Sequence, residues 1–377
     1  MQRVAFVHDW LVSRRGGEKV LEALLDIYPQ ADVFSLFGEP HLALDKKYLN
    51  RNFHFSFLQK IPFIQKFYQW FLPLFPLAIE SLNVLDYDLV ISSSHCVAKG
   101  IIIRPDATHI TYLHSPMRYA WDQMYAYLEV PKNFSLFKIF KYILFGIRFY
   151  FLHHLRIWDV TSTLRCHHII SNSHFVKKRC ELYYGKPSVV IHPPVQINKF
   201  YDPQSILSPH KKVLLFGSWV PYKKNLWALQ ILSKENISVI AAGHGKEFDT
   251  ARKLFKDHKN IEFVDSPTDA QLSALYRQSH VLLHPGIEDF GIIPVEAMAA
   301  GLYIVCPEEG GTKDTVIPGE TGWTFPFGSR DSMLAALHLA LDKALQKQAL
   351  YQHAQKFSGD SFTISIRQYI DNLSLKT

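Results

Sequence analysis

The sequence predicts an α/β protein made of two successive doubly wound domains, each built on a parallel sheet. Three observations support this prediction. The length of 377 residues is too great for one ordinary hydrophobic core. Short apolar runs alternate with segments of helical spacing, which is typical of βαβ units. The alternation starts again after a polar stretch at 196–212, so we place one domain at 1–200 and a second at 201–358.

The expected elements of the first domain follow its apolar runs. The first strand leads through a loop into a helix in which Val20, Leu21, Leu24 and Leu25 have helical spacing. The last strand ends the domain, because its two prolines cannot continue a hydrogen-bonded ladder. Strands are expected at 4–10, 88–94, 109–115, 167–173 and 188–195, and helices at 18–29 and 175–185.

The second domain shows the same alternation of strand and helix. A helix is expected to begin near Pro294, whose missing N–H costs nothing in a first turn, and to end at Gly301. The other elements are strands at 212–219, 238–243, 261–265, 280–285 and 303–307, and helices at 225–234, 249–258 and 269–279.

Composition narrows the class of protein. The chain is 48% hydrophobic and 20% charged, so it can bury a large interior. Its formal net charge of +7 is compatible with phosphorylated substrates, anionic lipid or nucleic acid, and does not choose among them. Four cysteines without CxxC spacing and an N-terminus without a signal peptide favour reduced thiols in a cytoplasmic protein. No apolar run is long enough to span a membrane.

Two glutamates, eight positions apart, mark the candidate site of the second domain. Glu288 is expected in the loop after the strand at 280–285, and Glu296 in the first turn of the next helix. Gly291 between them would let the backbone approach a ligand, and the N–H groups of the helix start favour an anion. Ligands of parallel sheets bind at the carboxyl ends of the strands. A carboxylate that accepts two hydrogen bonds beside a phosphate site suits a ribose diol.

Glu296 by itself has an equally good structural explanation. A glutamate in a first helical turn interacts favourably with the helix dipole and can close a capping box. The combination of a glutamate in a glycine-bearing loop with a second glutamate in the following helix favours the functional interpretation.

The segment 286–301, GIEDFGIIPVEAMAAG, resembles the E-x7-E signature of retaining glycosyltransferases with the GT-B fold, in the glycosyltransferase family 4 group. Further segments resemble the same group in the same order: VHDWLVSRRGGEKVLEAL, YLHSPMRYAWD, IISNSHFVKKR, VIHPPV, VPYKKN and GGTKDTVIPGETGWTF. The resemblance extends from Val4 to Phe325 and is weak at 40–85 and 130–160. HSPMRYAWD is similar to bacterial mannosyltransferases that use GDP-mannose in O-antigen or exopolysaccharide assembly.

The resemblance implies a donor site in the second of two Rossmann-like domains that face each other across a cleft. Glu296 would accept hydrogen bonds from the ribose, and Glu288 would contact hydroxyls of the transferred sugar. Backbone N–H groups of Phe290, Gly291 and Ile292 would face the sugar or the diphosphate, whose negative charge grows as the glycosidic bond breaks.

Lys223, in VPYKKN, would contact the donor diphosphate by the same resemblance, with Gly217 and Ser218 at the end of the preceding strand. From its chemistry alone, a solvated pair with Lys224 explains this lysine better. The family usually has an arginine where this chain has Ser218, and a hydroxyl does not replace a bidentate guanidinium. Lys224 or an arginine of the first domain would have to compensate.

Two glycine pairs lie in expected strand-to-helix loops, Gly16 with Gly17 and Gly310 with Gly311. Glycines there permit a tight turn and close backbone approach to a sugar phosphate or nucleotide, although an ordinary βα loop also explains them. Arg14 adds positive charge that would meet a phosphorylated acceptor or simply be solvated.

His114 follows the apolar run HITYL, and one histidine among 19 is most simply structural. The family, however, places a sugar-contacting histidine of the catalytic site at this position. Arg118 and Asp122 follow in the same segment, where they would face the acceptor or the donor sugar.

Two segments are unusually aromatic and basic. NFSLFKIFKYILFGIRFYFLHHLRIW, as a helix, places Lys138, Lys141, Arg148 and Arg156 on one narrow face, and FLQKIPFIQKFYQWFLPLFPLAI has a similar composition broken by prolines. Such a surface can lie in a membrane interface and attract anionic lipid, or it can belong to a buried helix with a thin solvent stripe. The sequence supports both equally, and a polyprenyl-linked acceptor would favour the membrane.

These features predict a retaining glycosyltransferase that moves a hexose, with mannose favoured, from a nucleotide-diphosphate sugar to a lipid-linked or saccharide acceptor in cell-surface polysaccharide synthesis. By the resemblance it would need no metal and no cofactor, and 359–377 would form a helix that crosses back to the first domain. We expect a cytoplasmic protein, with peripheral contact with the cytoplasmic membrane as an open alternative, and no binding of nucleic acid.

Three rival functions remain. The first is a non-catalytic nucleotide-sugar or glycan-binding relative, which Ser218 motivates. The second is a transferase with another donor, such as a UDP-sugar. The third is a phosphorylase on a similar fold, for which the sequence contains no motif for lysine-linked pyridoxal phosphate.

Overall fold

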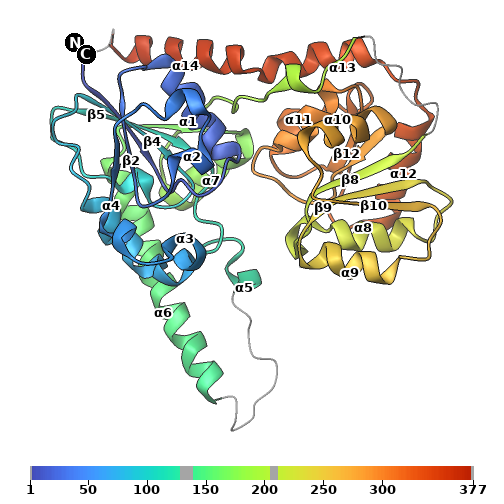
Figure 1. Ribbon diagram of the computed structural model, residues 1–377, viewed down its shortest axis with the longest axis horizontal. Helices are drawn as coiled ribbons and strands as arrows, with labels where there is room; N and C mark the ends of the chain where they lie inside the picture. The colour runs from blue at the N-terminus through green and yellow to red at the C-terminus, as the bar shows by residue number, and fades with distance from the viewer. Residues whose placement is uncertain (1, 128–138, 204–210, 375–377) are drawn as a thin grey trace. The chain divides into compact units, whose positions relative to one another are not determined.

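The computed structural model describes residues 2–127, 139–203 and 211–374, and the chain divides into two units (Figure 1). The first unit comprises Met1–His192 and Ser365–Thr377, and the second comprises Pro193–Ile364. Each unit has its own parallel sheet and its own hydrophobic core. The predicted fold class, two Rossmann-like α/β units, is confirmed.

The sheet of the first unit has seven strands in the order β3-β2-β1-β4-β5-β6-β7, all parallel. The strand order reverses between β1 and β4, and ligands of open parallel sheets bind outside the carboxyl ends of the strands at such a point. The strands are β1 (Val4–His8), β2 (Asp32–Ser35), β3 (Phe53–Phe55), β4 (Leu89–Ser94), β5 (Thr108–Leu113), β6 (His168–Ser171) and β7 (Val189–Val190).

The apolar side of the first helix is buried, since all four apolar residues that predicted it are buried. The helices are α1 (Gly16–Ile27), α2 (Pro40–Ala43), α3 (Ile64–Phe67), α4 (Phe75–Glu80), α5 (Met124–Tyr127), α6 (Ile139–Ser162) and α7 (His174–Tyr184). Gly16 and Gly17 form the first turn of α1, so they do not lie in a loop before the helix as predicted.

Three strands of this sheet differ from the prediction. β2 and β3 were not expected, because they are too short to show a clear alternation. The strand expected at 188–195 shrinks to β7, because Pro193 and Pro194 lack the N–H that would extend the ladder.

The sheet of the second unit has six parallel strands in the order β10-β9-β8-β11-β12-β13, which reverses between β8 and β11. Its strands are β8 (Val213–Ser218), β9 (Val239–His244), β10 (Ile261–Asp265), β11 (Val281–Leu283), β12 (Tyr303–Pro307) and β13 (Gly322–Phe325). Its helices are α8 (Asn225–Leu232), α9 (Lys246–Leu254), α10 (Asp269–Gln278), α11 (Ile292–Ala299), α12 (Arg330–Asp342) and α13 (Lys347–Ala354). β13, α12 and α13 were not predicted.

The final helix, α14 (Gly359–Ser374), begins in the second unit and ends among residues that belong to the first. All four cysteines are buried and free. Among the residues that the structure describes, no helix combines the length and apolar character that a membrane-spanning segment needs.

Candidate functional site

The second unit brings three loops to one edge of its sheet, at the point where the strand order reverses. β11 pairs with β8 on one side and with β12 on the other. Because the strands are parallel, the loops that follow them leave from the same edge. These loops carry Lys223, Glu288 and the pair Gly310–Gly311, all of which the sequence singled out.

Lys223 and Glu288 form an ion pair that is largely shielded from water. Nζ of Lys223 lies 3.0 Å from Oε1 of Glu288, and the two side chains are 15% and 19% exposed. Nε2 of His284, directly after β11, lies 3.2 Å from the same oxygen. Burial opposes the charge of Glu288, but Lys223 and His284 outweigh it and hold the pKa of that carboxyl well below its usual range. Glu288 is therefore ionised at neutral pH.

Glycines allow these loops to pack tightly against one another. A Cβ at Gly286 would come within 2.7 Å of Cα of Lys223, and a Cβ at Gly311 within 2.1 Å of the carbonyl oxygen of Asp289. Both distances are too short for any side chain. The N–H of Gly311 also donates to the carbonyl oxygen of Glu288 at 2.8 Å. The position of Glu288 therefore depends on glycines in two neighbouring loops.

α11 starts directly after the loop that carries Glu288. Its N-cap residue, Gly291, has a φ of 95°, in the left-handed region that favours glycine. The first N–H groups of the helix lack acceptors within it, so this end attracts negative charge. Glu296 is 6% exposed and lies in the second turn, because the helix begins at Ile292. The prediction of a first-turn position was wrong. Glu296 also cannot close a capping box, because that role belongs to the third helical residue, which is Pro294.

Gly217 and Ser218 end β8, next to the loop of Lys223. Gly217 has a φ of 138°, which a residue with a side chain rarely adopts. Oγ of Ser218 lies 3.3 Å from Nε2 of His244, on the neighbouring strand β9. Ser218 therefore contacts an imidazole at the place where the resemblance noted in the sequence leads one to expect an arginine.

The side chains of Lys224 and Phe290 contact aromatic rings of the second unit. Nζ of Lys224 lies 4.2 Å from the ring centroid of Phe327, so this lysine stacks on an aromatic ring. The side chain of Phe290 is buried with its ring 5.8 Å from that of Phe357. A ligand at this loop would therefore meet the backbone of Phe290.

The first unit carries a polar cluster where its own strand order reverses. His8 ends β1, Ser93 lies near the end of β4, and His114 follows β5. Oγ of Ser93 is 3.2 Å from Nδ1 of His8 and 2.8 Å from Nε2 of His114. Burial, together with the neighbouring His95 and His8, lowers the pKa of His114 to about 3, so the ring is neutral at pH 7. Gly17 lets α1 start close by, since a Cβ there would lie 3.4 Å from Cε1 of His8.

Asp9 organises the loop after β4. Its buried carboxylate accepts hydrogen bonds from the backbone N–H groups of residues 95–98 at 2.7–2.9 Å and lies 3.0 Å from Nδ1 of His95. Burial opposes this charge, but His95 outweighs it, and the pKa of Asp9 is held well below its usual range. Burial likewise opposes a charge on His95, but the Asp9 carboxylate outweighs it and raises the pKa of His95.

The predicted acceptor residues of the first unit are held by internal contacts. The guanidinium of Arg14 lies 2.9 Å from the Glu22 carboxylate. Asp122 lies 2.6 Å from a guanidinium nitrogen of Arg179. Arg118 is partly buried. Arg14 and Asp122 are thus each paired with an oppositely charged side chain of the first unit.

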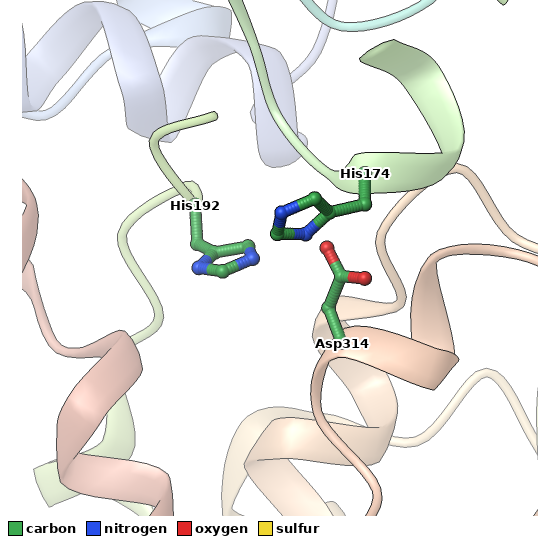
Figure 2. Close-up of side chains that lie close together, drawn as sticks. All are labelled: His174, His192 and Asp314. Atoms are coloured by element: carbon green, nitrogen blue, oxygen red, sulfur yellow. The ribbon is translucent and has the colours of Figure 1, made fainter. Parts of the chain in front are cut away.

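His174 and His192 are two further histidines of the first unit (Figure 2). His174 opens α7 and His192 follows β7, and their ring centroids are 6.3 Å apart. Asp314, also drawn in Figure 2, belongs to the second unit, where it ends the 3₁₀ helix Gly311–Asp314.

Sequence reasoning missed several polar residues at these two edges: His8, Asp9, Glu18, Ser93, His95 and His284. A signal was present for most of them. His8 directly follows the apolar run VAFV and is followed by Asp9, His95 directly follows the expected strand LVISSS, and His284 directly follows the apolar run VLL. A polar residue just after such a run lies at the edge of a parallel sheet where ligands bind.

Residues 203–357, which lie in the second unit, match the family model described as Glycosyl transferases group 1. An uncharacterized glycosyltransferase of Methanocaldococcus jannaschii is 30% identical over 127 residues, 31% of this chain and 32% of that protein. The D-inositol 3-phosphate glycosyltransferase of Corynebacterium glutamicum is 30% identical over 118 residues, 29% of this chain and 28% of that protein. The alpha-1,3/1,6-mannosyltransferase of Schizosaccharomyces pombe is 27% identical over 203 residues, 42% and 40% of the two chains. The chain spans less than half the length of these relatives.

Solved structures resemble the whole chain. Anabaena HepE in complex with UDP has a TM-score of 0.67 at 16% identity and covers 98% of this chain and 100% of its own. Sucrose-phosphate synthase from Thermosynechococcus elongatus has a TM-score of 0.68 at 15% identity and covers 100% of both chains. At these identities the likeness concerns the fold, which is the GT-B glycosyltransferase fold.

Proposed function

We propose that this protein is a retaining, metal-independent hexosyltransferase. It moves a hexose, with mannose favoured, from a nucleoside diphosphate sugar to a saccharide or polyprenyl-linked acceptor in cell-surface polysaccharide synthesis. The observation that carries the proposal is the Lys223–Glu288 pair beside the start of α11, inside the domain that matches glycosyl transferases group 1. A fixed cation and a helix N-terminus, which together suit a diphosphate, meet there.

In this proposal the two glutamates bind different parts of the donor. Glu296 accepts hydrogen bonds from the ribose, and Glu288 contacts hydroxyls of the sugar. Lys223 and the N–H groups of residues 290–292 stabilise the charge that the diphosphate gains as its bond to the sugar breaks. His114 of the first unit contacts a sugar hydroxyl. Because fixed protein charges perform the electrostatic work, we expect EDTA to leave the rate unchanged.

A panel of nucleotide sugars tests the function without knowledge of the acceptor. The purified protein is incubated with radiolabelled GDP-mannose, GDP-fucose, UDP-glucose and UDP-galactose, and slow hydrolysis of the donor is followed. We expect hydrolysis of GDP-mannose, with the α-anomer released first when the products are followed by NMR. A protein that neither binds nor hydrolyses any member of the panel would contradict the proposal. Binding without hydrolysis or transfer would support the non-catalytic alternative.

Alanine substitutions separate the roles of the two glutamates. Glu296→Ala should weaken GDP binding by about 1–3 kcal/mol, because a charged hydrogen-bond acceptor is lost. Glu288→Ala should lower the rate of donor hydrolysis more than the affinity for GDP, because its partner is the sugar. Unchanged GDP affinity in folded Glu296→Ala would rule out the ribose assignment.

A UDP-sugar is the second candidate donor. HepE, which the chain resembles in fold, was solved with UDP. This chain also has Ser218 where the family described above usually has an arginine, so the mannosyltransferase resemblance is incomplete at this loop. The same panel distinguishes the two donors.

The second part of the proposal concerns the membrane, and the sequence of two segments supports it. Residues 57–79 and 133–158 together contain six lysines and arginines and no aspartate or glutamate. Such one-sided charge favours an anionic lipid surface, to which each basic residue near the surface adds roughly 1 kcal/mol.

The described parts of these segments also expose large apolar side chains. In the first segment, Phe63 is 77% exposed and Trp70 is 78% exposed. On α6 the exposed ones are Ile143, Leu144, Ile147, Phe149, Tyr150, Phe151 and Ile157. This exposure contradicts the alternative of a buried helix for that part of α6.

The predicted basic face of this helix is incomplete. Lys138 lies outside the described residues, and Arg156 turns back to donate to the carbonyl oxygen of Ala120 at 3.2 Å.

The two segments lie together in the first unit. Leu152, Leu155 and Trp158 of α6 pack in the same hydrophobic cluster as Tyr68 and Phe75. Figure 1 shows α6 reaching past α3, away from the sheet of this unit. The exposed apolar residues of both segments are therefore suited to enter one lipid interface.

Co-sedimentation with vesicles tests this contact. We expect binding to vesicles of phosphatidylglycerol and phosphatidylcholine, weaker binding to phosphatidylcholine alone, and loss of binding in the double variant Phe63→Ser, Trp70→Ser. Leu182→Ser is the matched control, because Leu182 is 75% exposed on α7, outside both segments. Equal binding of the double variant and the control would contradict the membrane contact.

A further inference from the structure

Four polar side chains of the first unit form a chain that leads from a carboxylate to His114. Oε1 of Glu18 lies 3.7 Å from Nε2 of His8, whose Nδ1 lies 3.2 Å from Oγ of Ser93. The same Oγ lies 2.8 Å from Nε2 of His114. The four residues come from α1, β1, β4 and the end of β5, so the chain crosses the point where the strand order reverses.

The inner end of this chain is closed to water. His8 and Ser93 have no exposed surface, and the side chain of Glu18 is 7% exposed. Nε2 of His8 has no hydrogen-bond partner within the described residues, and the group it faces is the Glu18 carboxylate. A buried polar nitrogen without a partner is costly, so this contact favours a proton on Nε2 that points at the carboxylate.

Glu18 sets the direction of the chain. Its second oxygen, Oε2, accepts the backbone N–H of Arg15 at 2.9 Å. Burial opposes the charge of Glu18, but the contact with His8 and the backbone N–H groups outweigh it and lower the pKa of the carboxyl. An ionised carboxylate only accepts hydrogen bonds. A His8 ring with a single proton therefore carries it on Nε2, which leaves its Nδ1 as an acceptor.

The same rule decides the next two hydrogen bonds. Ser93 has one hydroxyl proton, which it donates to Nδ1 of His8, so its oxygen must accept from His114. His114 is neutral at pH 7 and has one ring proton, which is therefore on Nε2. Nδ1 of His114 is left as a bare acceptor, and within the described residues the structure gives it no hydrogen bond.

We propose that Glu18, His8 and Ser93 are positioning residues that hold His114 in the tautomer whose Nδ1 accepts a hydrogen bond. The ligand group that His114 takes is then a hydroxyl, and not a phosphate or carboxylate oxygen, because a nitrogen lone pair repels an anion. The inference rests on the proposed function in assigning this hydroxyl to a sugar. It makes this position selective for an uncharged sugar group.

The isosteric substitution Glu18→Gln should reverse the whole chain. The N–H of Arg15 requires the amide oxygen of the new side chain, which turns the amide NH₂ toward Nε2 of His8. His8 then carries its proton on Nδ1, Ser93 donates to Nε2 of His114, and the proton of His114 moves to Nδ1.

Nitrogen NMR of the full-length protein with ¹⁵N-labelled histidine measures the tautomer, and the variant His114→Gln assigns the signals. At pH 8, well above the ordinary histidine pKa of about 6.5, we expect Nε2–H in the wild type and Nδ1–H in Glu18→Gln. Glu22→Gln is the matched control, because Glu22 lies one turn further along α1, is also 7% exposed and pairs with Arg14. It should leave the tautomer of His114 unchanged. In a Ser93→Ala background, Glu18→Gln should have no effect, because the connection is cut.

An Nδ1–H tautomer in the wild type would overturn the inference, whether or not the variants fold. A folded Glu18→Gln variant that keeps the wild-type tautomer would also overturn it. The measurement needs no substrate, so its outcome is independent of the nucleotide-sugar panel. Donor hydrolysis together with an Nδ1–H tautomer would refute the positioning role of Glu18, His8 and Ser93 and leave the proposed function standing. An Nε2–H tautomer in a protein that neither binds nor hydrolyses any donor would refute the proposed function and leave the positioning role standing.

Discussion

Lys223 and Lys224 are neighbours in the sequence with different surroundings in the fold. Lys223 reaches the carboxylate of Glu288, while Lys224 stacks on Phe327. Lys224 has a φ of 53°, in the left-handed region, where the chain turns from the 3₁₀ helix Pro221–Lys223 into α8. This turn sends the two side chains to different partners, although their chemistry is the same.

Lys223→Met should weaken GDP binding by about 1.5–3 kcal/mol, because a charge-assisted hydrogen bond to the diphosphate is lost. This corresponds to a roughly tenfold or greater rise in the dissociation constant. Lys224→Met is the control and should change the affinity little. Titration calorimetry of both folded variants decides the matter, and equal losses would argue that neither lysine is specific to the diphosphate.

His95 should contribute pH-dependent stability. Because Asp9 raises the folded-state pKa of His95 above about 6.5, its contribution is complete below that pH and is lost as the pH rises through the folded-state pKa. The difference in free energy of unfolding between wild type and His95→Gln should therefore be larger at pH 6 than at pH 9. Urea unfolding at both pH values measures it. A difference that stays constant or grows with pH would show that Asp9 does not stabilise a protonated His95.

At the scale of elements, the loops of the proposed donor site are shaped by glycines that contact backbone. Gly286 faces Lys223, and Gly311 faces the carbonyl of Asp289. A backbone group cannot rotate away as a side chain can, so a methyl group at either position must move a whole loop. Gly146 in α6 is the opposite case, because a Cβ there would meet nothing within 4 Å.

Gly311→Ala and Gly146→Ala should therefore change stability in opposite directions. Gly311→Ala should destabilise the protein by about 1–3 kcal/mol, the usual cost of overpacking, and should also lower GDP affinity. Gly146→Ala should stabilise it by about 0.5–1 kcal/mol, because alanine loses less entropy in a helix. Thermal or urea unfolding measures both changes. Similar effects at the two positions would mean that the loop contacts at Gly311 are not tight.

At the scale of the whole molecule, each unit has a separate hydrophobic core. Among the described residues, clusters of buried apolar side chains within 5–184 belong to the first unit, and a cluster within 195–357 belongs to the second. The proposed nucleotide site is built from the second unit, so nucleotide binding should stabilise that unit selectively.

GDP at 100 times its dissociation constant should stabilise the second unit by about 2.7 kcal/mol. In hydrogen exchange followed by mass spectrometry, the slowest amides of β8 and β11 should gain protection, while those of β1 and β4 should not. Lys223→Met at the same GDP concentration is the control, with a smaller gain. Equal protection of both sheets would show that the units unfold as one or that GDP binds elsewhere.

The sequence by itself determined the α/β class, the two parallel sheets and the edge at which Glu288 and Lys223 lie. Apolar runs and strand-to-helix alternation are local patterns, and in a parallel sheet they fix which end of each strand carries the loops. Only the tertiary structure decided which polar groups meet. It brought Lys223 and His284 to the carboxylate of Glu288. It placed Lys224 against Phe327 and Arg14 against Glu22. It also connected Glu18 to His114 through His8 and Ser93. These contacts join residues from loops and strands far apart in the sequence, and their geometry depends on close packing and on left-handed residues that no local pattern encodes.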